Sequence, residues 1–180
     1  ASSFVMNVQS IVSRTVAPKQ PAVLTVGKMV VGTRFNVIAE NAVIEGTVRC
    51  FDPQVRDHIE RELGHYAQQV AAIYGAEAKL DYVRGTQAVI NEESSALRVQ
   101  RVAAAAFGAD SLYDEEPTMG GEDFSFYLDE VPGSFALVGS GNPDKDTQWA
   151  HHHGRFNVDE DALVTGAELY AQYAWAYLHE

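Results

Sequence analysis

Apolar residues at helical spacing predict two helices in the first half of the chain. Residues 3–16 carry apolar side chains three and four positions apart, and the prolines that follow end this helix. Residues 53–73 repeat the spacing behind Asp52 and Pro53. That pair is typical of a helix start, because aspartate caps the first turn and proline fits within it. Both stretches are amphipathic, so we expect each helix to bury one face.

Three stretches in the same half predict strands. Residues 21–32, 41–51 and 77–85 are rich in β-branched residues or alternate between apolar and polar positions. In the second stretch the alternation directs Arg49 outward and gives the core face four residues, namely Ile44, Gly46, Val48 and Cys50. Residues 1–90 therefore predict an α+β sandwich, with one layer of helices on an antiparallel sheet that lacks a leading strand.

The second half of the chain predicts three helices and one strand. The helices cover residues 91–108, with a Ser or Asn cap and a glycine stop, a short stretch from about Glu122, and an amphipathic stretch over 159–180. The unbroken apolar run in residues 133–141 predicts a strand buried on both faces. A domain boundary is expected near residues 88–93, so the predicted domains are 1–90 and 91–180, of α/β class overall.

Composition and charge limit the kinds of molecule that the protein can bind. The chain has 180 residues and a formal net charge of -12, and an acidic surface repels phosphate backbones, which excludes nucleic acid. No apolar run approaches the ~18 residues that span a bilayer, and the first residues show no secretory signal. Cys50 is the only cysteine, lies within a predicted strand and is expected to be structural. A single cysteine is typical of a reducing compartment, so a cytoplasmic location is expected.

The consecutive histidines 151–153 are the first candidate for chemistry. Imidazole binds Zn, Mn, Co and Ni well. Adjacent side chains in an extended loop point to opposite sides, so at most one or two of the three can bind one ion. From the residues alone, a metal ligand and a solvated loop both remain open, whereas an internal run followed by a helix start argues against a purification tag.

Two further sites have the residues for binding a carboxylate. Gly120 and Gly121 can bring backbone N–H groups close to an anion, although a simple turn before a helix with Glu122 in its first turn is the alternative. Arg49 can hold a carboxylate through two parallel hydrogen bonds, although a surface ion pair with Glu45 is the alternative. Asn36 lies thirteen residues before Arg49 in the sequence.

Four stretches together resemble one known family. They are QSIVSRTVAPKQPAVLTVG, GTRFNVIAENAVIEGTVRCF, MGGEDFSFYLDEVPGSFALVGSG and HHGRFNVDEDAL, and they span almost the whole chain. The chain resembles the C-terminal half of the metal-dependent aminoacylase, hippurate hydrolase and carboxypeptidase family, and is most similar to its amidohydrolases acting on N-acyl amino acids.

The resemblance implies an enzyme with a catalytic α/β domain that binds two divalent metals (Zn, Mn, Co or Ni) and an inserted lid domain that forms a homodimer. Residues 1–90 correspond to the lid without its first strand, and residues 91–180 to the last part of the catalytic domain. His152, four residues before Phe156, corresponds to a metal ligand.

The resemblance also implies roles in substrate binding. Asn36 corresponds to a residue that polarises the scissile carbonyl, and Arg49 to one that holds the substrate carboxylate, in many relatives across the dimer. Gly120 and Gly121 correspond to a turn whose backbone helps to bind that carboxylate. The family's His-x-Cys-Gly-His-Asp motif and its Glu-Glu pair, which includes the general base, are absent. The chain alone is therefore expected to be inactive, and a non-catalytic dimerisation or binding module is the alternative.

Overall fold

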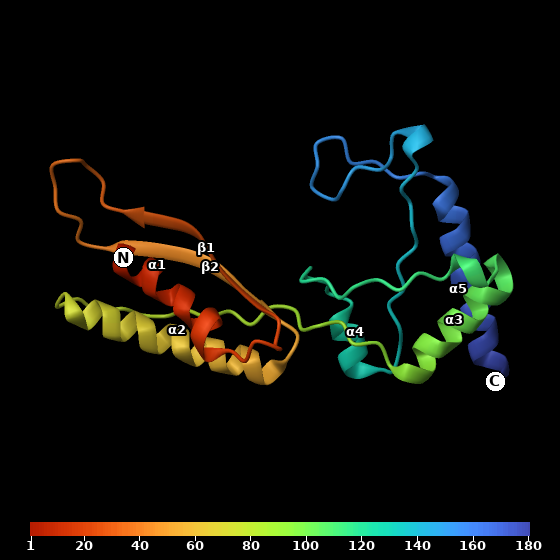
Figure 1. The fold of residues 1–180 in the computed structure, drawn as a ribbon, viewed down its shortest axis with the longest axis horizontal. Helices are drawn as coiled ribbons and strands as arrows, with labels where there is room; N and C mark the ends of the chain where they lie inside the picture. The colour runs from red at the N-terminus through yellow and green to blue at the C-terminus, as the bar shows by residue number, and fades with distance from the viewer. The chain divides into compact units, whose positions relative to one another are not determined.

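The computed structural model describes residues 1–180, and the chain divides into two compact units (Figure 1). Unit 1 consists of Ala1–Ala88 and Thr118–Asp123, and unit 2 of Val89–Pro117 and Phe124–Glu180. The fold is mixed α/β with one small antiparallel sheet. None of its helices has the length and apolar character needed to cross a membrane.

Unit 1 contains the helices and the first two strands that the sequence predicts. Its elements are α1 (Ser2–Ser10), which continues into a π-helical turn at Ile11–Thr15, β1 (Ala22–Val31), β2 (Ala42–Cys50) and α2 (Pro53–Ile73). The predicted cap of α2 is confirmed, because the Asp52 carboxylate accepts a hydrogen bond from the Gln54 backbone N–H at 2.7 Å.

β1 and β2 form an antiparallel hairpin, with Ala22 opposite Cys50 and Val31 opposite Ala42. The register is interrupted between Val26 and Lys28, as at a β-bulge. A Cβ at Gly46 would overlap the Thr25 carbonyl oxygen on the facing strand, so glycine lets the two backbones approach.

Helices α1 and α2 lie on one side of the hairpin (Figure 1). Val8, Ile11 and Ile59 are fully buried between the layers. Ile44, Val48 and Cys50 are half-buried while Arg49 is exposed, so the predicted alternation along β2 is confirmed, apart from the exposed Gly46.

The strand predicted over residues 77–85 is not formed. The sheet has two strands only, and the backbone of this stretch pairs with neither of them. Arg84 instead ties the stretch to α2 through ion pairs with Asp57 at 2.7 Å and Glu60 at 2.5 Å. Alternating polarity favours extended backbone, but a strand also needs a hydrogen-bonding neighbour.

Unit 2 contains α3 (Glu93–Phe107), a 3-10 turn at Ala109–Ser111, α4 (Ser125–Glu130), a second 3-10 turn at Pro143–Lys145, and α5 (Asp161–His179). Helix α3 is capped by Glu92, whose carboxylate accepts from the backbone N–H groups of Ser94 and Ser95 at 2.9 and 2.8 Å. The prediction of a Ser or Asn cap is therefore wrong in residue type. The Glu92 side chain accepts from the backbone N–H groups two and three positions after it, which are the donors that a Ser or Asn cap would satisfy.

The strand predicted over residues 133–141 is also not formed. Its backbone joins no sheet, and Leu137 is 71% exposed rather than buried on both faces. Its first residues are fixed by Asn91, whose side chain exchanges two hydrogen bonds with the backbone of Phe135. A strand buried on both faces needs neighbouring strands and covering helices, and unit 2 supplies no such strands.

Candidate functional site

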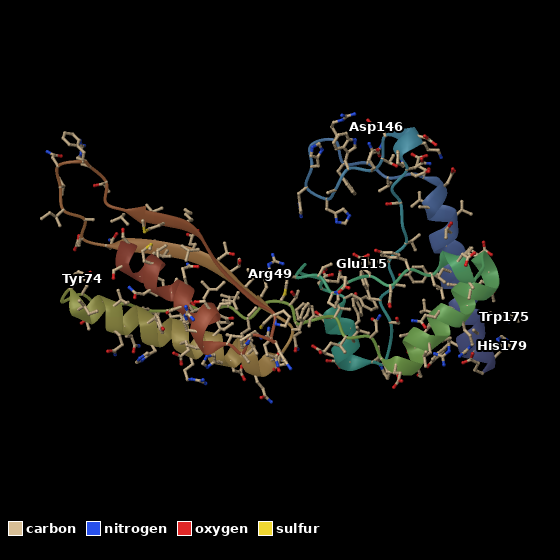
Figure 2. All side chains as sticks on the ribbon, viewed as in Figure 1. Arg49, Tyr74, Glu115, Asp146, Trp175 and His179 are labelled. Atoms are coloured by element: carbon tan, nitrogen blue, oxygen red, sulfur yellow. The ribbon has the colours of Figure 1, made fainter.

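Arg49 lies on the outer face of the hairpin, at the end away from the loop that joins β1 and β2 (Figure 2). Its Nη1 donates a hydrogen bond to the carbonyl oxygen of Met119 at 2.7 Å. Glu45 is instead paired with Lys28 at 3.1 Å. The surface ion pair between Arg49 and Glu45 is therefore not formed, and Arg49 reaches the turn that contains Gly120 and Gly121.

Glycine is not required by the backbone at either position of this turn. Neither Gly120 nor Gly121 has a positive φ. A Cβ at Gly120 would meet only Thr118 Oγ1 at 3.6 Å, and a Cβ at Gly121 would meet Arg49 Nη1 and Thr86 Oγ1, each at 3.7 Å. These are ordinary van der Waals contacts, so a methyl group would be tolerated at either position, and Gly121 borders both a guanidinium and a hydroxyl.

The alternative view of the turn as the start of a helix is weakened by the position of α4. We expected a short helix from about Glu122, but α4 begins at Ser125. Glu122 and Asp123 therefore precede α4 and are not part of its first helical turn. A carboxylate interacts favourably with the helix dipole when it lies in that first helical turn.

Asn36 is not brought to this site within one chain. It lies exposed in the loop between β1 and β2, at the opposite end of the hairpin from Arg49. The seven residue-to-residue steps along β2 from Ala42 to Arg49 span ~23 Å at the usual rise of a strand. Phe35 and Ile38, on either side of Asn36 in the loop, are fully exposed.

The three histidines of residues 151–153 differ in their surroundings. The His151 ring meets Phe156 edge-on at 4.9 Å, and the His153 ring stacks on Trp149 at 4.6 Å. His153 Nδ1 also accepts the Arg155 backbone N–H at 3.1 Å. His152 is exposed, has a φ of 66° and makes no hydrogen bond, ion pair or ring contact. The structure thus leaves one imidazole of the three unengaged, and it is the predicted ligand.

The loop that carries His152 is organised around Asp146. Trp149 Nε1 donates to its carboxylate at 2.9 Å and Arg155 at 2.5 Å, and these hydrogen bonds lower the pKa of Asp146. The Arg155 guanidinium also covers the Trp149 ring at 4.2 Å. The Trp149 ring is therefore in contact with both the Arg155 guanidinium and the stacked ring of His153.

The chain's own residues do not complete a metal site. No group of three or more His, Cys, Asp or Glu side chains is placed to hold an ion. A catalytic zinc usually takes three protein ligands and a water. His152 fits one such position by its chemistry, and the remaining positions have no counterpart in these residues.

Cys50 has the surroundings of a structural thiol. It is half-buried on the core face of β2, and its Sγ donates to the Asp52 carbonyl oxygen at 3.6 Å. Burial raises the pKa of the Cys50 thiol, and the charge of Asp52 adds to this effect while Arg56 opposes it. A raised pKa disfavours the thiolate that a nucleophile requires.

Thr86 and the carbonyl of Met119 were not among the candidates from the sequence. Thr86 lies in a stretch without regular structure, and Met119 contributes a backbone atom. Neither residue type nor spacing marks them, because their proximity to Arg49 arises only when three distant segments meet.

The comparisons with known proteins agree on one family. Residues 5–176 match the family described as Peptidase family M20/M25/M40. YhaA of Bacillus subtilis (strain 168) is 37% identical over 176 residues, which cover 98% of this chain and 44% of that protein. N-acetyl-L-cysteine deacetylase of the same strain is 38% identical over 164 residues, or 91% of this chain and 38% of that protein.

A solved structure is similar over almost the whole chain. The Bacillus subtilis YXEP protein, described as a dinuclear metal binding peptidase from the M20 family, superposes with a TM-score of 0.80 at 28% identity, over 99% of this chain and 45% of that one. The chain thus spans less than half the length of these relatives. The match over residues 5–176 shows that the chain belongs to Peptidase family M20/M25/M40.

Proposed function

We propose that these residues form part of a metal-dependent amidohydrolase that cleaves the amide bond of N-acyl amino acids, hippurate-like compounds among them. Membership of the family supports hydrolysis of an amide, and one relative is named for removing the acetyl group of N-acetyl-L-cysteine. An N-acyl amino acid offers three features to recognise, namely an acyl group, an amide carbonyl and a free carboxylate.

The observation that carries the proposal is the meeting of Arg49 with the glycine turn. Arg49 uses one N–H on the Met119 carbonyl, and its other N–H groups have no partner in the chain. A guanidinium beside exposed backbone N–H groups binds a carboxylate through charge-assisted hydrogen bonds. Arg49, Gly120 and Gly121 would anchor the free carboxylate of the substrate and orient its amide.

Asn36 would act in the active site of a second copy of the chain. Its amide would donate a hydrogen bond to the oxygen that becomes negative when the scissile carbonyl is attacked. Because ~23 Å of strand separates the two ends of the hairpin, Asn36 and Arg49 of one chain cannot contact the same small substrate. A homodimer formed through the lid, residues 1–90, would bring the Asn36 of one protomer to the Arg49 of its partner.

His152 would supply one ligand to a centre of two divalent metals (Zn, Mn, Co or Ni). When bound, such metals polarise a carbonyl and lower the pKa of a bound water. The unengaged ring of His152, on a loop held by Asp146, Trp149 and Arg155, supports this role. The other ligands and the general base would come from the part of the family fold that these residues do not match.

In this proposal residues 1–90 are the lid and residues 91–180 the end of the catalytic domain, so the chain is a C-terminal half and is inactive alone. A non-catalytic dimerisation or binding module is the second candidate, favoured by the lack of any group of metal-binding side chains. Dependence on a divalent metal distinguishes the enzyme from the binding module. A chelator removes the activity of a metal-dependent enzyme, whereas a binding module has no catalytic activity that a chelator could remove.

The proposal is tested by assaying hippurate and N-acetyl-L-cysteine hydrolysis with the 180-residue chain and with the complete product of its gene. We expect the complete product to be active with added divalent metal and inactive after chelation, and the 180-residue chain to be inactive with every metal. Hydrolysis by the chain alone at a comparable rate, or a complete product inert with all four metals, would contradict the proposal.

A further inference from the structure

We propose that Thr86 is a further residue of the carboxylate site, and that its hydroxyl binds the second oxygen of the substrate carboxylate. The inference rests on the proposed function, since it extends the site that Arg49 and the glycine turn form. It adds a second hydrogen-bond donor, beside the Arg49 guanidinium, for the substrate carboxylate.

Three separate segments of unit 1 converge here. Arg49 comes from β2, Gly121 from the turn at Thr118–Asp123, and Thr86 from the stretch that follows Arg84. Arg49 Nη1 and Thr86 Oγ1 each lie 3.7 Å from the position of the missing Gly121 Cβ. The two polar groups are therefore no more than twice that distance apart.

A carboxylate can bridge two donors that lie within this distance of each other. Its two oxygens can each accept a hydrogen bond of ~2.8 Å from opposite sides, one from a guanidinium and one from a hydroxyl. Arg49 and Thr86 are both exposed, and Gly121 has no side chain that would cover them. The guanidinium favours a charged carboxylate over a neutral carboxamide, whereas the hydroxyl can donate or accept and adds affinity for either group.

The fold holds Thr86 by its backbone and leaves its hydroxyl unused. Its carbonyl oxygen accepts a hydrogen bond from Arg56 Nη1 at 3.4 Å, and Arg84 nearby is paired with Asp57 and Glu60. The hydroxyl makes no hydrogen bond in the chain, and the residue is exposed. Replacing the hydroxyl by a methyl group is thus expected to leave the fold unchanged.

The test is a titration of the ¹⁵N-labelled chain with hippurate and, in parallel, with its neutral amide, followed by the NMR signals of Arg49 Nε and the Gly120 and Gly121 amides. Thr86→Val removes the hydroxyl at equal size, and Thr86→Ser keeps it. Thr47→Val is the matched control, because Thr47 is exposed on the same face of β2 as Arg49.

We expect hippurate to shift these signals in the wild type, in Thr86→Ser and in Thr47→Val, and its amide to shift them far less. Thr86→Val is expected to bind hippurate about tenfold more weakly. Equal hippurate affinity in Thr86→Val and the wild type would overturn the role of Thr86 and leave the Arg49 site standing. No hippurate-induced shift at Arg49 or Gly121 in the wild type would overturn both.

Discussion

The two units of the chain differ in how far each buries its own apolar residues. Unit 1 has a core of Val8, Ile11 and Ile59, all fully buried. In unit 2, by contrast, the buried residues are small or polar, and α5 has none at all. Leu163 and Trp175 of α5 are each 66% exposed.

The difference follows from where the partners of each element lie in the sequence. α1, β1, β2 and α2 are consecutive, so unit 1 closes its core with neighbours along the chain. The apolar residues of unit 2 are as numerous, but this unit offers them little to pack against. Exposed apolar side chains along α5, such as Leu163 and Trp175, agree with the proposal that unit 2 is the end of a larger catalytic domain.

The largest expected effect is on the core of unit 1. Ile59→Ala leaves a cavity among fully buried neighbours, so we expect it to lower the free energy of unfolding by about 2–5 kcal/mol. Leu163→Ala removes a similar volume from an exposed position in unit 2 and should cost less than about 0.5 kcal/mol. Urea denaturation of the two variants measures both values, and equal costs would show that the two units do not differ as described.

A glycine-to-alanine substitution in each unit tests the same difference in packing between the units. Gly46→Ala would place a Cβ against the Thr25 carbonyl oxygen and should cost about 1–3 kcal/mol. Gly166→Ala lies within α5, where the new Cβ meets nothing within 4 Å, and should stabilise the helix by up to about 1 kcal/mol. The melting temperatures of both variants are measured from the far-UV circular dichroism of the helices. A lower melting temperature in Gly166→Ala than in the wild type would mean that other residues pack over α5 at this position.

Much of unit 1 could be predicted from the sequence, because its helices and its hairpin depend on local patterns. The two predicted strands that failed, residues 77–85 and 133–141, have suitable residues but no hydrogen-bonding neighbour, which a local pattern cannot reveal. The same limit of local patterns explains why only part of the candidate site could be predicted. Arg49 could be singled out as an outward cation on a strand, but Met119 and Thr86 could not, since they meet it only through tertiary structure.

A smaller effect is expected in the histidine loop. His152 has a φ of 66°, which costs a non-glycine residue roughly 1 kcal/mol. His152→Gly should therefore raise the stability of the chain slightly, while removing the proposed ligand. His153→Gly should lower it, because this variant loses the stack on Trp149 and the acceptor for the Arg155 N–H. A loss of stability in His152→Gly as large as that in His153→Gly would contradict this account of the loop.

The smallest effect should be visible only as a trend with pH. Hydrogen bonds from the backbone N–H groups of Ser94 and Ser95, and from the Ser94 hydroxyl, lower the pKa of Glu92 to about 2 from 4.5. Since the folded state has the lower pKa, the cap stabilises unit 2 above about pH 4.5, and this stabilisation is lost as the pH falls toward 2.

Glu92→Gln should therefore be less stable than the wild type at pH 6, with the difference shrinking between pH 4.5 and 2. Asp159, whose pKa is also lowered to about 2 by Lys145, acts in the same window and keeps part of the pH dependence in the variant. Melting temperatures across this range are the measurement, and a difference that does not change with pH would rule out the cap as its source.

The central claim is that one active site takes Arg49 from one copy of the chain and Asn36 from another. The most direct test mixes two inactive variants of the complete gene product, Asn36→Ala and Arg49→Ala, and measures hippurate hydrolysis. A mixed dimer has one site with both residues intact, so about one quarter of the wild-type activity should return on random exchange of subunits. If both residues came from the same chain, every site in every mixture would lack one of them, and no activity would return.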